Sequence, residues 1–159
     1  MKFIFAFLIA FLPLQQTNLE TLRDFYPKAS TSKANADKFQ ALASKAQGSD
    51  AVMNAYRGAA KIIQAKFEKG QGRKALIVSG IKSLEGAVNA NPANIELRII
   101  RLSVQENLPK IVGYHSKMAE DKKMILKNYA AQNGSLKQYI REFAAVSKTM
   151  TAAEKASLK

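Results

Sequence analysis

The chain has 159 residues, of which 47% are hydrophobic, and its 25 basic and 12 acidic side chains give a formal net charge of +13. This hydrophobic content is high enough for a folded core and excludes a wholly disordered chain. The absence of cysteine excludes disulfides, thiolate catalysis and cysteine-based metal sites. The basic residues are spread evenly, without any run of three, which favours solvated helix faces over a nucleic-acid-binding stripe.

The N-terminal segment has the pattern of a secretory signal peptide. Lys2 precedes an apolar run at residues 3–12, which is too short to cross a bilayer as a helix. We therefore predict a signal peptide at 1–16 and a single α-helical domain at 17–159. An N-terminal core helix and an uncleaved anchor are the alternatives. The prediction places the protein in the periplasm or outside the cell, with no transmembrane segment in the mature chain.

Helical periodicity and capping signals run along the rest of the chain, whereas the alternation of a half-buried strand never persists. The expected fold class is all-α, as an irregular array of about six to eight helices. We predict helices at 19–26, 33–47, 51–67, 74–90, 94–107, 116–132 and 136–146, followed by a short helix capped by Thr151 and Glu154.

Small residues mark the third and fourth of these helices. Asp50 is a suitable N-cap for the third helix, which has a flank of alanine and glycine that would let another helix approach closely. Gly80 and Gly86 lie inside the fourth helix and are expected to mark close packing. The glycine-rich segment 70–72 is predicted to be the loop between the two helices.

The junction LEGAVNANPANIE, at residues 84–96, resembles the boundary between two tetratricopeptide repeats. In that family an alanine and an apolar residue close the second helix, as Ala87 and Val88 do here, and a proline-containing link follows, here 91–94. The 34-residue period is not sustained, and the loop at 108–116 is longer than a regular repeat allows. The resemblance implies repeat-like antiparallel helical hairpins and a protein-binding scaffold.

The fifth predicted helix has apolar residues on two sides. On a helical wheel, Ile95, Ile99 and Leu102 form one face, and the opposite face contains Leu97, Ile100, Val104 and Leu108. This pattern predicts a central helix packed on both sides. The two seams between the faces, expected to meet solvent or line a concave surface, contain Arg98, Arg101 and Gln105 on one side and Glu96, Ser103 and Asn107 on the other.

The stripe of Arg98, Arg101 and Gln105 is the best candidate for a ligand- or partner-binding site. Guanidinium groups recognise carboxylates and phosphates through paired hydrogen bonds. In the alternative interpretation the arginines are structural and pair with a carboxylate such as Glu85 or Asp121. Two further candidate contact residues, Tyr114 and His115, follow in the next loop.

No motif for catalysis or for cofactor binding occurs, and the only histidine, His115, cannot build a metal site alone. We expect no cofactor and no metal. The predicted function is that of a non-catalytic exported scaffold or adaptor that binds another envelope or secreted protein. The first alternative is an electrostatic binder of acidic surfaces, either anionic lipid headgroups or cell-wall polymers. The second is a small hydrolase.

Overall fold

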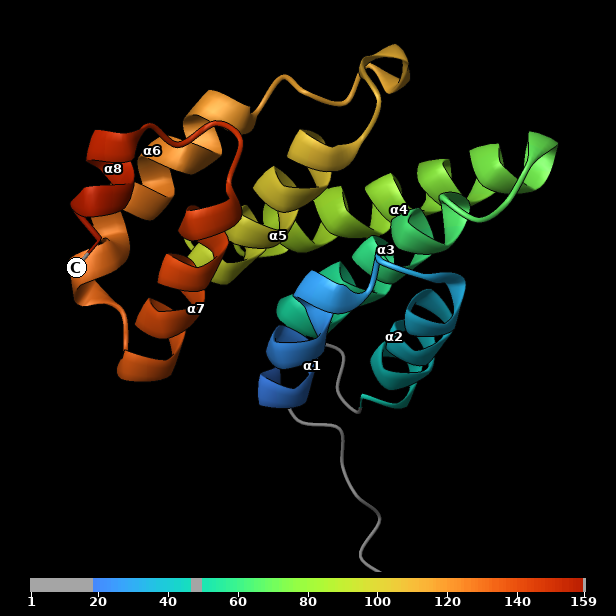
Figure 1. Ribbon diagram of the computed structural model, residues 1–159, viewed down its shortest axis with the longest axis horizontal. Helices are drawn as coiled ribbons and strands as arrows, with labels where there is room; N and C mark the ends of the chain where they lie inside the picture. The colour runs from blue at the N-terminus through green and yellow to red at the C-terminus, as the bar shows by residue number, and fades with distance from the viewer. Residues whose placement is uncertain (1–18, 47–49, 159) are drawn as a thin grey trace, which may run out of the picture.

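The computed structural model describes residues 19–46 and 50–158, and within them the fold is all-α, with eight α-helices, three short 3-10 turns and no strand (Figure 1). The predicted fold class is therefore confirmed, whereas the predicted signal peptide lies outside the described residues. No helix in the described part of the chain is both long enough and apolar enough to span a membrane. The elements are α1 (Leu19–Phe25), η1 (Tyr26–Lys28), α2 (Lys33–Lys45), α3 (Ala51–Ala65), α4 (Gly70–Ala90), α5 (Ile95–Asn107), η2 (Lys110–Val112), α6 (Met118–Asn128), η3 (Tyr129–Ala131), α7 (Gly134–Val146) and α8 (Ala152–Ala156).

Side-chain caps fix where most of the helices begin. Asp50 and Asn94 accept hydrogen bonds from backbone N–H groups in the first turns of α3 and α5. Thr151 and Glu154 form the predicted reciprocal capping box at the start of α8. Helix α7 begins at Gly134, two residues earlier than predicted, because Asn133 caps it and accepts a hydrogen bond from the backbone N–H of Leu136.

Two helix boundaries differ from the prediction by about a whole turn. The segment 70–72, predicted to be a loop, forms the first turn of α4, and its Gly70 has the positive φ of 55° that glycine adopts most easily. Glycine lowers helix propensity, but the guanidinium of Arg73 donates to the backbone oxygens of Ala65 and Lys66 and ties this first turn to the end of α3. Helix α6 is shorter than predicted, because its last turn, 129–131, tightens into the 3-10 turn η3.

Helices α3 and α4 form the closest packed pair, and glycines make the approach possible. A Cβ atom added at Gly58 would lie 2.7 Å from the carbonyl oxygen of Gly80, and one added at Gly80 would lie 2.7 Å from that of Gly58. The prediction of close packing is therefore confirmed for Gly80. It is wrong for Gly86, where an added Cβ would have no neighbour within 4 Å.

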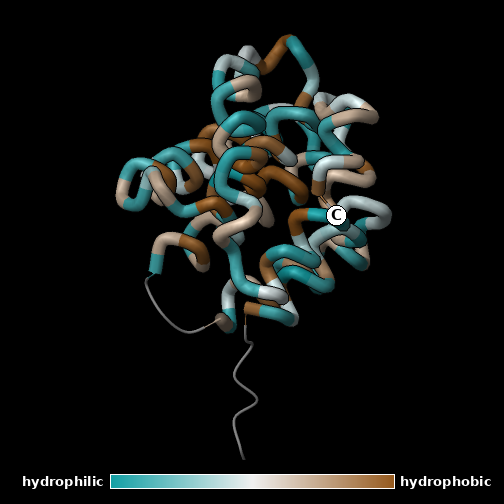
Figure 2. The backbone as a smooth tube through the Cα atoms, turned by 90° about the vertical axis from the view of Figure 1, so that its left-hand side faces the viewer, coloured by the Kyte–Doolittle hydropathy of each residue, from teal (hydrophilic) through white to brown (hydrophobic). Residues whose placement is uncertain are grey.

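Helix α5 separates two hydrophobic cores, as predicted for a helix packed on both sides. Its Leu97, Ile100 and Val104 belong to a core built with α1 to α4. Its opposite face joins a second core with α6, α7 and the C-terminal segment, and contributes Ile95, Ile99 and Leu102. Figure 1 shows α5 between these two groups of helices, and Figure 2 shows hydrophobic segments gathered in the middle of the molecule.

The seams of α5 do not face solvent as predicted. Arg101 is 2% exposed and Gln105 is fully buried, while Glu96 on the opposite seam is 3% exposed. Helix α6 covers the first seam, and Arg23 of α1 pairs with Glu96 on the other. Only Asn107, in the last turn of α5, is exposed. The first two turns of α5 are consequently buried on all sides.

Candidate functional site

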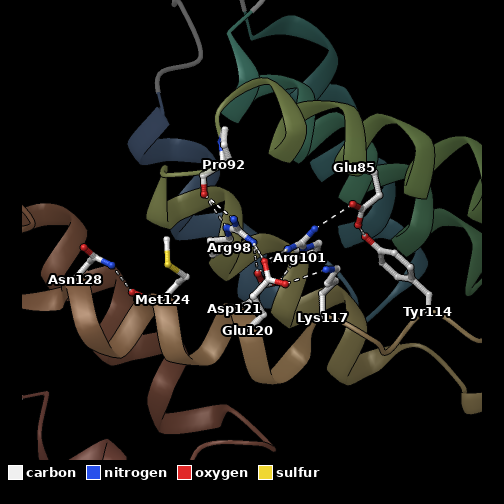
Figure 3. Close-up of polar contacts among 10 residues, drawn as sticks. All are labelled: Glu85, Pro92, Arg98, Arg101, Tyr114, Lys117, Glu120, Asp121, Met124 and Asn128. Carbon is white, nitrogen blue, oxygen red and sulfur yellow. Dashed lines mark hydrogen bonds and ion pairs between the residues drawn. The ribbon is translucent and has the colours of Figure 1, made fainter.

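A buried carboxylate holds the two arginines of the predicted stripe. Asp121 of α6 is fully buried, and its two oxygens accept hydrogen bonds from Nε and Nη2 of Arg101, each at 2.7 Å. Nη1 of Arg98 donates to the same carboxylate at 2.9 Å. Figure 3 shows both guanidinium groups directed at Asp121. The alternative interpretation, in which the arginines pair with Asp121, is therefore confirmed.

Further groups complete this cluster from three directions. Arg98 donates to Glu120 at 2.8 Å and, through Nε and Nη2, to the backbone oxygen of Pro92 in the link between α4 and α5. Arg101 donates to Glu85 of α4 at 3.0 Å. Glu85 also accepts a hydrogen bond from the hydroxyl of Tyr114. The cluster thus ties α5 to α4, to α6 and to the loop that follows α5.

The electrostatics favour this arrangement in its charged form. Burial lowers the pKa of Arg101, but the hydrogen bonds and negative charge of Asp121 outweigh burial and raise the pKa above its ordinary value. Burial, together with the bond to Glu85, raises the pKa of Tyr114, so the phenol stays protonated and donates. The arginines already bind carboxylates of their own chain. A role for Arg98 and Arg101 in binding a partner stays a prediction that would require displacement of Asp121.

The other three predicted site residues have different surroundings. Tyr114 is half-buried and reaches the cluster through Glu85, whereas Nε2 of His115 lies 3.1 Å from the backbone oxygen of Leu108. Gln105 is fully buried, and neither Nε2 nor Oε1 of its side chain has a hydrogen-bond partner among the described residues. The structure therefore brings Arg98, Arg101 and Tyr114 into one cluster, and the bonds of that cluster include neither Gln105 nor His115.

A second buried polar cluster was not predicted. Arg23 of α1 donates to both oxygens of Glu96, at 2.8 and 2.5 Å, and the hydroxyl of Tyr56 donates to Glu96 at 2.9 Å. Burial raises the pKa of Tyr56, and also that of Tyr139, which lies within hydrogen-bonding distance of it. The position of Glu96 on the helical wheel could have predicted this cluster. A carboxylate between the two apolar faces of a helix that is packed on both sides needs a hydrogen-bonding partner.

Two surface grooves are further candidate sites within the described part of the chain. The first, here named the basic groove, has a volume of about 620 Å³. It is lined by Gln40, Ser44, Ala51, Asn54, Arg57, Lys61, Lys82, Ser83, Gly86, Ala87 and Ala90. The second, here named the apolar groove, has a volume of about 330 Å³ and lies between α4 and the turn η2. It is lined by Gly70, Arg73, Lys74, Ile77, Val78, Ile111 and Val112.

The sequence did not predict the grooves, because each is formed by residues far apart in the chain and no periodic pattern within one helix indicates it. Among the described residues, no group of three or more histidine, cysteine and acidic side chains could hold a metal ion.

No family model, curated protein or solved structure matches this chain. The described helices define it as an all-α protein with packed helix pairs. The resemblance of residues 84–96 to a tetratricopeptide junction stays a prediction.

Proposed function

We propose that this protein is a non-catalytic, exported helical adaptor that binds another exported protein through the apolar groove. One observation carries the proposal. Ile111 is 96% exposed and Val78 is 58% exposed, and both side chains line the same groove, together with Ile77 and Val112. A single exposed apolar residue is ordinary on a protein surface, whereas several around one hollow are typical of a contact site.

The loop after α5 is built so that Ile111 projects outward. Pro109 begins the turn η2, and Gly113 ends it with a φ of 73°, a left-handed conformation that favours glycine. Tyr114 then anchors the returning chain to Glu85, and the ring of His115 contacts the backbone oxygen of Leu108. The loop stands above the N-terminal half of α4 in Figure 1. Its fixed ends keep the apolar tip exposed.

The lining of the apolar groove indicates the chemistry of the partner. Its lining combines aliphatic side chains with the positive charges of Arg73 and Lys74, and it includes no acidic side chain. A matching segment would present apolar residues at helical spacing, flanked by acidic side chains, as in helix-in-groove recognition. We therefore propose an acidic amphipathic segment of another exported protein as the occupant.

Site-specific photocrosslinking in the producing cells tests this function. A photoreactive residue at position 111 should give a discrete adduct with one protein, which persists at about 0.5 M salt because apolar contacts are not screened. The Val78→Ser change should abolish that adduct. The matched control is position 146, since Val146 is also an exposed apolar residue, at 74%, but lies on α7.

Three results would contradict the proposal. The first is equal crosslinking from positions 111 and 146, and the second is an adduct that disappears in salt. The third is a crosslinked segment without apolar residues at helical spacing and acidic neighbours. Export is tested separately by N-terminal sequencing of the mature protein, which we expect to begin between residues 15 and 18.

A further inference from the structure

We propose that the basic groove is a binding site for a phosphate-bearing ligand. Three helices contribute to it from different parts of the chain. Helix α3 contributes Asn54, Arg57 and Lys61, at spacings of three and four residues along one face. Helix α4 contributes a facing row of residues that includes Lys82 and Gly86, and α2 contributes polar side chains such as Ser44.

The groove is open because small residues line it on α3 and α4. An added Cβ atom at Gly86 would meet nothing within 4 Å, so this face of α4 leaves space above the backbone. Three alanines extend the opening along α3 and α4, at Ala51, Ala87 and Ala90. The segment of α3 from Asn54 to Lys61 rises by about 10 Å, which gives room for a ligand with more than one charged group.

The charges that line the groove are all positive. Arg57, Lys61 and Lys82 contribute three cations, and no acidic side chain is among the lining residues. Neither lysine forms an ion pair or a side-chain hydrogen bond within the described part of the chain. In contrast, Lys33, Lys117 and Lys122 pair with nearby carboxylates. The basic groove therefore combines concavity with lysines that are available to an anion.

Arg57 has a different role from the two lysines. Its guanidinium donates to the backbone oxygens of Ala43 and Ala46 at the end of α2, at 3.2 and 2.5 Å. These bonds hold its charge at a fixed position in the groove. They also join the end of α2 to α3 at this edge of the groove.

The donors suit a phosphate group. Lysine ammonium groups act as point charges, and several of them can contact different oxygens of one phosphate or diphosphate. Lys61 and Lys82 come from different helices, and the Ser44 hydroxyl, which accepts a bond from Gln40 at 3.1 Å, keeps its own hydrogen to donate. The ligand is therefore a phosphate group, whether free, polymeric or in a lipid headgroup.

Titration calorimetry with inorganic pyrophosphate tests the site, on the protein as purified from its producing cells at about 0.15 M salt. The double variant Lys61→Gln with Lys82→Gln should bind about tenfold more weakly or worse, because it loses two charge-assisted contacts. The matched control is Lys123→Gln with Lys127→Gln on α6. It removes the same charge from exposed lysines that have no ion-pair partner within residues 19–46 and 50–158. We expect its affinity to stay within about twofold of the parent.

A third variant tests the groove itself without a change of charge. Gly86→Leu places a good helix former in open space, so the fold should persist while the side chain fills the groove. It should weaken pyrophosphate binding as much as the lysine pair does. Circular dichroism on every variant confirms that the helices are retained.

Binding to vesicles of phosphatidylglycerol and phosphatidylcholine distinguishes the sources of phosphate. Binding to pyrophosphate and vesicles, or to vesicles alone, supports the proposal if the groove variants lose this binding and the α6 control keeps it. Binding to vesicles alone identifies a lipid headgroup as the source of the phosphate. Equal losses in the groove and control variants would show attraction to net charge and overturn the proposal. An absence of binding to either probe would also overturn it.

Discussion

At the scale of single residues, Asp121 joins α6 to α5 through buried hydrogen bonds with two arginines. A fully buried carboxylate would be costly on its own, and so would the two buried guanidinium groups around it. The carboxylate and the guanidinium groups satisfy one another's charge and hydrogen bonds. Arg98 and Arg101 of α5 share Asp121 of α6 as their acceptor. The arginine stripe that suggested a binding site is thus part of the packing between these helices.

Removal of the charge on Asp121 should show how much the stability of the fold depends on this buried cluster. Asp121→Asn leaves two buried arginines short of an anion, and we expect a loss of about 3–5 kcal/mol in the free energy of unfolding, measured by urea denaturation. Glu120→Gln is the control, because Glu120 pairs with Arg98 but is 47% exposed, and its loss should cost less than about 1 kcal/mol. Similar losses in the two variants would contradict a structural role for the buried cluster.

At the scale of elements, the pairing of α3 with α4 depends on the contact between Gly58 and Gly80. At each glycine, the carbonyl oxygen of the other glycine lies too close for a Cβ atom to fit. A methyl group at Gly80 would also lie 2.6 Å from the side chain of Ile62, so both this side chain and the facing backbones would have to shift to admit it. The hairpin is also the frame of the basic groove, since both of its helices line that groove.

Two glycines of α4 allow a matched test of this packing. Gly80→Ala should destabilise the protein by about 1–3 kcal/mol, because the added methyl group collides with α3. Gly86→Ala should stabilise it by up to about 1 kcal/mol, because the same change in an open helical position only improves helix propensity. Thermal unfolding followed by circular dichroism measures both. A melting temperature that moves in the same direction for both variants would contradict the assignment.

At the scale of the whole molecule, α5 is the element on which both cores depend. Ile99 and Ile100 are neighbours in sequence and are both fully buried, yet they belong to different cores. The buried clusters around Asp121 and Glu96 add polar ties from the same helix to α1, α3, α4 and α6. The described helices should therefore unfold together.

Acidic substitutions on the two faces test this dependence. Ile99→Asp and Ile100→Asp should each cost several kcal/mol, because each buries an unpaired carboxylate or forces it to stay protonated. Each should also give a single unfolding transition when tyrosine fluorescence and circular dichroism are compared. Asn107→Asp, at an exposed position of the same helix, is the control and should change little. A harmless effect of either isoleucine variant would contradict the central position of α5.

The amino-acid sequence by itself determined the fold class, most helix starts and the two apolar faces of α5. These features depend on residues a few positions apart, such as Thr151 with Glu154, or Ile99 with Leu102, and such spacing is visible in the sequence. Only the tertiary structure decided that Arg98 and Arg101 are covered, because Asp121 lies about 20 residues away along the chain and could have faced solvent. The same holds for the two grooves. Each needs side chains from separate segments to meet, and long-range packing, which no local pattern encodes, brings them together.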